Sequence, residues 1–141
     1  MTENNPEINT ETRKGSCLCK TVTFEITGSI SGVGQCHCSK CRKASGTASN
    51  AMIIIGARRF RWTSGEQHTQ RFDSGNHWSV TRCKTCGSPL PASHDGKRVW
   101  VPAGLMDDPL NAQINGHIFV ASTADWDVIH DDAPQFDEYP P

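Results

Sequence analysis

The sequence lacks long apolar runs and an excess of charge of either sign. No stretch approaches the roughly 20 apolar residues that a membrane-spanning helix needs, and only 35% of the 141 residues are hydrophobic. The 14 lysines and arginines nearly balance 15 acidic residues, which leaves a formal net charge of −1. These absences argue against a membrane segment and against binding driven by attraction to nucleic acid.

The two ends of the sequence lack the apolar periodicity of folded segments. Residues 1–13 are polar and contain no apolar core of a secretory signal, so we expect a disordered arm on a cytoplasmic protein. Residues 131–141 are acidic and contain three prolines, which predicts an extended acidic tail. The remaining residues 14–130 suit one domain, whose small apolar core bound metal would help to stabilise.

Cysteine is what the sequence has in quantity, and it occurs in clusters. All seven cysteines fall in a C-x-C pair, a C-x-C-x-x-C triplet and a C-x-x-C pair. A disulfide framework would leave one thiol over, and the two sulfurs of a C-x-C cannot bridge each other without strain. In a reducing cytoplasm such clusters are typical of metal sites, and thiolate is a ligand that zinc prefers. The clusters therefore predict zinc sites.

The two outer pairs are expected to form one closed site. Cys17 and Cys19 lie far in sequence from Cys83 and Cys86, and each pair sits on a turn beside a predicted strand. Four thiolates complete the tetrahedral shell of a structural zinc. The alternative, a redox C-x-x-C at the second pair, would need a βαβ setting that the surrounding sequence does not supply.

The central triplet of Cys36, Cys38 and Cys41 differs, because three ligands leave a fourth position for water or substrate, as in catalytic zinc sites. Three thiolates make the zinc a poor generator of hydroxide but suit it to binding an incoming thiol. Two alternatives stay open. The triplet site could be only partly occupied, or a distant histidine could close it and make it structural, the candidates being His68, His77, His94 and His117.

Three basic residues lie beside the triplet: Lys40, Arg42 and Lys43. Their functional interpretation is that they bind the carboxylates of a substrate such as glutathione, which carries two. The alternative is that they form an ordinary solvated face, as most charge runs do.

Hydrophobic periodicity predicts a mainly β fold of antiparallel sheets with one short helix, stabilised by zinc. Val22, Phe24 and Ile26 alternate with polar residues, as in a half-buried strand. Ser39 is expected to cap a helix over Lys40–Ser45, and Gly46 to end it in the left-handed conformation. A continuous apolar run predicts a buried strand at Met52–Ile55. Three segments that follow it are expected to form an antiparallel meander: Phe60–Thr63, Gln70–Phe72 and Trp78–Thr81. Two more strands are predicted at Val99–Val101 and His117–Val120.

Three motifs together resemble the glutathione-dependent formaldehyde-activating family, which also includes centromere protein V. The resemblance spans Gly15 to about Trp126 and rests on the stretches Gly15–Cys19, Cys36–Gly46 and Cys83–Leu90. Two positions depart from the family pattern. Lys20 stands where the family usually has glycine, and Arg82 stands where an aromatic residue is common.

The resemblance implies a zinc-stabilised β fold with two zinc ions, one at the outer pairs and one at the triplet. It also implies a carbon-sulfur lyase similar to S-(hydroxymethyl)glutathione synthase, with glutathione and formaldehyde as substrates and with Cys36, Cys38 and Cys41 as ligands of the catalytic zinc. Two other functions fit the same residues. One is a zinc enzyme acting on a different thiol or carbonyl compound, and the other is a non-enzymatic zinc module that binds a protein or nucleic-acid partner.

Overall fold

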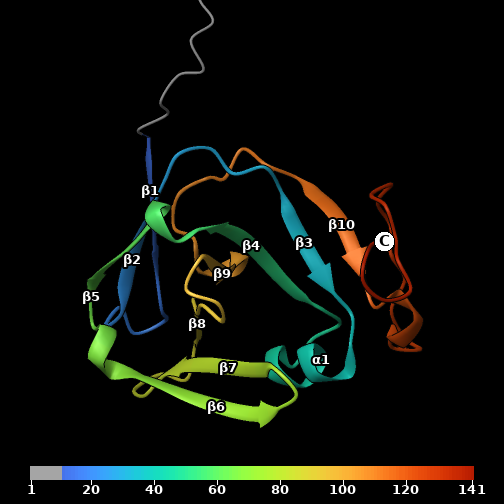
Figure 1. The fold of residues 1–141 in the computed structure, drawn as a ribbon, viewed down its shortest axis with the longest axis horizontal. Coiled ribbons are helices and arrows are strands. Elements are labelled where there is room, and N and C mark those ends of the chain that lie inside the picture. The colour runs from blue at the N-terminus through green and yellow to red at the C-terminus, as the bar shows by residue number, and fades with distance from the viewer. Residues whose placement is uncertain (1–10) are drawn as a thin grey trace, which may run out of the picture.

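The computed structural model describes residues 11–141, which form three small sheets and one short α-helix, α1 (Ser39–Ser45) (Figure 1). The strands are β1 (Thr12–Ser16), β2 (Thr23–Thr27), β3 (Val33–Cys36), β4 (Asn50–Gly56), β5 (Phe60–Ser64), β6 (Thr69–Gly75), β7 (Trp78–Cys83), β8 (Pro89–Leu90), β9 (Arg98–Pro102) and β10 (Ile114–Ile118). Single 3-10 turns occur at Ala57–Arg59, Glu66–His68, Ala103–Leu105 and Val120–Ser122. None of the helices in these residues is long and apolar enough to cross a membrane.

The first sheet has the strand order β1-β2-β5, the second β10-β3-β4-β9, and the third β6-β7-β8. All pairings are antiparallel except that of β10 with β3, which is parallel. The mainly β fold with one short helix is therefore confirmed, with one mixed sheet among antiparallel ones. Figure 1 shows α1 between the end of β3 and the β6–β7 hairpin.

The core lies between the first two sheets. Phe24 and Ile26 of β2 are fully buried and pack with Ile53 and Ile55 of β4. A Cβ at Gly15 would lie 2.3 Å from the Phe24 ring, so only glycine lets β1 approach the core this closely. A second, smaller apolar cluster contains Cys17, Val22, Cys83 and Leu90.

Several local expectations need correction. β5 pairs with β2 rather than with β6, so the predicted meander is reduced to the β6–β7–β8 sheet. Ile54 is 51% exposed, because β4 buries only alternate residues and leaves the other face to solvent. The expectation of a disordered arm over residues 1–13 is wrong at Thr12 and Arg13, because β1 begins at Thr12 and Arg13 is buried, donating to the carbonyls of Gly28 and Pro109. Residues 1–10 of that arm lie outside the described part of the chain.

The helix begins one residue earlier than predicted. Cys38, not Ser39, is the N-cap, and its Sγ accepts the N–H of Cys41 at 3.3 Å. Sulfur takes this role because the C-x-x-C spacing places it over the first turn of the helix. Gly46 ends the helix with φ of 70°, as predicted.

The C-terminal segment lies alongside β10 (Figure 1). The backbone N–H of His117 donates to Pro134 O and the N–H of Phe136 donates back to His117 O, both at 2.9 Å. The rings of Phe119 and Tyr139 make an edge contact with centroids 4.9 Å apart. The segment thus extends the second sheet beyond β10 with a few backbone bonds.

Lys20 adopts a left-handed backbone conformation with φ of 66°. Glycine adopts this conformation without steric cost, which agrees with the glycine usual at this position in the family that the sequence resembles. We expect Lys20→Gly to raise the free energy of unfolding by about 0.5–1 kcal/mol. Glycine removes the steric cost of holding a residue with a side chain in the left-handed conformation, and this gain exceeds the additional backbone entropy that glycine loses on folding. Urea unfolding of the metal-loaded protein measures this. Lys97→Gly is the matched control, since Lys97 has no positive φ and glycine there should lower stability instead.

Candidate metal centres

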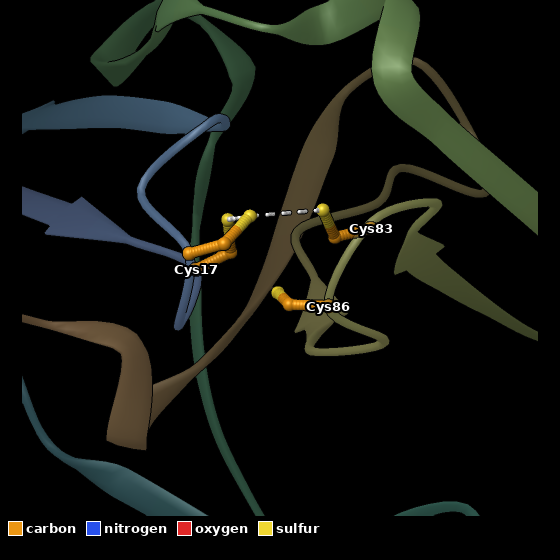
Figure 2. Close-up of side chains that lie close together, drawn as sticks. Cys17, Cys83 and Cys86 are labelled. Carbon is orange, nitrogen blue, oxygen red and sulfur yellow. Dashed lines mark hydrogen bonds between the residues drawn. The ribbon is translucent and has the colours of Figure 1, made fainter.

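The two outer cysteine pairs come together as the sequence predicted. Cys17 and Cys19 lie on the turn between β1 and β2, and Cys83 and Cys86 lie at the end of β7 and on the turn that follows. Figure 2 shows the labelled Cys17, Cys83 and Cys86 directing their sulfurs toward a common centre. The Sγ atoms of Cys17 and Cys19 are 3.6 Å apart, and those of Cys19 and Cys83 are 3.8 Å apart.

These sulfur separations suit one metal ion. A tetrahedral zinc with Zn–S bonds of about 2.3 Å requires sulfurs about 3.8 Å apart. All four Sγ atoms lie within 4.8 Å of one another. The outer cluster could therefore hold a zinc ion with little rearrangement.

Hydrogen bonds to sulfur favour thiolate in the exposed half of this cluster. The hydroxyl and N–H of Ser88 lower the pKa of Cys86 to about 5, and the hydroxyl and N–H of Thr21 lower the pKa of Cys19. Gly87, with φ of 79°, allows the turn that presents the Ser88 N–H. Burial raises the pKa of Cys17 instead, so a cation in the cluster would have to supply the energy that deprotonates this thiol.

The central triplet is also assembled. Cys36 ends β3, Cys38 caps α1 and Cys41 lies in its first turn, with all three sulfurs within 4.8 Å of one another. The hydrogen bond between Cys36 and Cys41 raises the pKa of Cys36 and lowers the pKa of Cys41 to about 6. The two sulfurs are thus close enough to share a proton, and a soft cation bound there would displace it and favour thiolate at both.

Two residues that were not predicted as part of the site also act on Cys41. The side chains of Trp78, the first residue of β7, and Asn50, the first residue of β4, lower the pKa of Cys41 by hydrogen bonding to its sulfur. Only the tertiary fold brings these strand starts beside α1.

Among residues 11–141, no histidine, aspartate or glutamate joins the triplet as a fourth ligand. The alternative of closure by a distant histidine therefore finds no support in the structure. The ring of His94 makes a tilted contact with Trp100, with centroids 5.0 Å apart, and His68 and His77 are exposed. His117 is buried and directs its ring to Asp131 and His37.

His37 lies between two triplet cysteines but points away from them. Its Nε2 is 2.9 Å from Nδ1 of His117, and its Nδ1 is buried without a hydrogen-bond partner in the described residues, 3.8 Å from an Asp127 carboxylate oxygen. Burial, together with the charge of His117, lowers the pKa of His37. The hydrogen bond from His117 lowers the pKa of Asp131. No local pattern in the sequence predicts this chain of groups.

The three basic residues beside the triplet lie on α1. Lys40 and Lys43 are exposed, whereas Arg42 is half-buried and its Nε has no partner in the described part of the chain. A further cation is Arg82 of β7, which donates to Gly87 O at 3.0 Å and also to Ala44 O in the last turn of α1. One guanidinium thus connects the turn of the outer cluster to the helix of the triplet.

The described residues form a mainly β domain whose two cysteine clusters could each hold a metal ion. A family model described as glutathione-dependent formaldehyde-activating enzyme matches residues 12–122, so the chain belongs to this family. The resemblance drawn from the three cysteine motifs is thereby confirmed. The fold is also similar to the crystal structure of a Rhodobacter sphaeroides protein, with a TM-score of 0.57 and 17% identity over 72% of this chain and 99% of that chain. At this identity the likeness concerns the fold alone.

Proposed function

We propose that this protein is a zinc-dependent carbon-sulfur lyase that joins a thiol, with glutathione the first candidate, to a small aldehyde, with formaldehyde the first candidate, or splits the adduct. In the forward direction the thiol S–H bond breaks, sulfur bonds to the carbonyl carbon, the carbonyl π electrons move to oxygen, and oxygen takes up one proton in exchange for the proton that the thiol released. No oxidant or reductant is required. Family membership supports the reaction class.

The observation that carries the proposal is the difference between the two clusters. The outer cluster contains four sulfurs and the central cluster three, with no fourth protein ligand among residues 11–141. We assign a structural zinc to Cys17, Cys19, Cys83 and Cys86, and a second zinc to Cys36, Cys38 and Cys41. When bound at the triplet, zinc would lower the pKa of an added thiol from its usual value of about 8.5.

The residues around the triplet have distinct roles in this proposal. The side chains of Asn50 and Trp78 favour the thiolate of Cys41 by lowering its pKa. Lys40 and Lys43, exposed on α1, would attract the carboxylates of glutathione, and half-buried Arg42 carries an unused Nε donor beside them. Clustered thiols suit a reducing compartment, so we place this chemistry in the cytoplasm.

The test replaces zinc with cobalt and titrates glutathione while the thiolate-to-cobalt charge-transfer band is recorded. We expect the band to gain intensity as a fourth sulfur is added. Lys43→Glu should weaken glutathione binding several-fold without loss of metal. Arg58→Glu, at the far end of β4 from α1, is the matched control and should change nothing.

An unchanged spectrum at millimolar glutathione would contradict the use of glutathione. A further titration with small thiols of other structure then separates the remaining possibilities. A response to one of them would indicate an enzyme with a different thiol substrate. If no thiol changes the spectrum, the alternative function is favoured, in which the protein is a non-enzymatic zinc module that binds a macromolecular partner.

A further inference from the structure

Two buried histidines connect the triplet to the C-terminal segment. His37 and His117 are each 1% exposed and 80 residues apart in sequence. Nε2 of His37 lies 2.9 Å from Nδ1 of His117, and Nε2 of His117 lies 2.9 and 3.1 Å from the two carboxylate oxygens of Asp131. The three side chains form one continuous line of hydrogen bonds.

The chemistry of the three groups fixes the direction of these bonds. A carboxylate can only accept, so Nε2–H of His117 donates to Asp131. With one proton on each ring, Nδ1 of His117 then accepts from Nε2–H of His37. Each imidazole is thereby held in one tautomer and one orientation, and the carboxylate of Asp131 sets both.

His37 is held by its backbone as well as by its ring. Its N–H donates to Ile118 O of β10 at 3.0 Å. Cys36 and Cys38 flank it, and successive side chains of an extended backbone point to opposite sides. A fixed His37 ring on the inner side therefore fixes the two neighbouring sulfurs on the outer side.

Apolar packing supplies little of this support. Neither of the two apolar clusters in the described residues includes Cys36, Cys38 or Cys41. Buried imidazoles are costly unless hydrogen-bonded. The turn that carries the ligands thus depends on polar contacts to β10 and to the segment beyond it.

The last member of the line lies outside the residues that the family model matches, which end at 122. Asp131 belongs to the segment that runs beside β10, and its Oδ1 also accepts the N–H of Ala133 at 3.0 Å, which orients the carboxylate. The family match therefore assigns no role to this residue.

We propose that Asp131 and His117 are positioning residues that act through His37 to hold the Cys36–Cys38 turn in its metal-binding conformation, so that the C-terminal segment sets the metal affinity of the triplet. Groups that orient ligands from behind typically change metal affinity by about 10–100-fold when removed. The proposal concerns metal binding and does not depend on which thiol or aldehyde is used.

The test measures cobalt affinity of the two clusters in the full chain by chelator competition. Asp131→Ala should weaken the triplet by roughly 10–100-fold and alter its d–d spectrum, while the four-cysteine cluster keeps its affinity. Asp131→Asn should restore most of the affinity, because its amide oxygen can accept from His117. Asp132→Ala, which removes the neighbouring exposed carboxylate, is the matched control.

A second control separates positioning from a general loosening of the segment. Tyr139→Ala removes the ring contact with Phe119 but leaves Asp131 in place, and should keep the triplet affinity. The proposal is overturned if Asp131→Ala binds cobalt at the triplet as wild type does, or if Asp132→Ala or Tyr139→Ala weakens the triplet equally. A wild-type chain that takes up no metal at the triplet overturns it as well.

Discussion

Cys83→Ser should leave the protein largely unfolded at room temperature. Cys83 is 2% exposed and packs with Cys17, Val22 and Leu90, so the smaller apolar cluster includes two of the four outer cysteines. Structural zinc supplies about 10–16 kcal/mol in small zinc domains, whereas whole domains are stable by only about 5–15 kcal/mol. Loss of one ligand should therefore remove several kcal/mol, a large part of the total.

Circular dichroism and thermal melting test this expectation. Thr85→Ser, an exposed position in the same turn, is the matched control and should melt as wild type does. Removal of metal from the wild-type protein with a strong chelator should reproduce the Cys83→Ser result. If the serine variant is soluble with an unchanged melting temperature, the outer site does not stabilise the fold.

Cys38→Ser, unlike Cys83→Ser, should keep the fold but lose one metal ion. Serine is a good N-cap, and its oxygen can accept the Cys41 N–H as the sulfur of Cys38 does. It is a much poorer ligand for zinc than thiolate. We expect the triplet to lose at least about a hundredfold in metal affinity and any lyase activity to fall to background.

Metal analysis after gel filtration should therefore give two zinc ions for wild type and one for Cys38→Ser, with melting temperatures within a few degrees. Ser39→Ala is the matched control, since Ser39 is exposed and neither caps the helix nor lies in the cluster. Two zinc ions retained by Cys38→Ser would mean that the triplet is not a metal site.

Local patterns predicted local structure well. The alternation from Val22 to Ile26 matches the burial of β2, and Gly46 ends α1 in the left-handed conformation. Cysteine spacing also predicted which sulfurs gather, because a short C-x-C or C-x-x-C turn leaves few directions for its side chains.

Features that depend on strands far apart in sequence were not predictable. The parallel pairing of β10 with β3 leaves no mark in the residues of either strand, yet it brings His117 to His37. By residue type alone His117 is a candidate ligand for the triplet, but in the structure its ring contacts His37 and Asp131 instead. The position of Asn50 and Trp78 beside Cys41 could not be predicted for the same reason. Each lies in a strand segment without a local motif, and only the assembled sheets bring it near the triplet.

Arg82 offers a route for thermodynamic coupling between the two cysteine clusters. Its guanidinium connects Gly87 O, beside the outer cluster, with Ala44 O at the C-terminal end of α1, where a cation is also favoured by the helix dipole. If both clusters bind metal as we propose, ordering of the outer turn by one ion would also place Arg82 against α1, and binding at one cluster would raise the affinity of the other. Because such coupling is reciprocal, a thiol that completes the triplet site would strengthen metal binding at a cluster that it never touches.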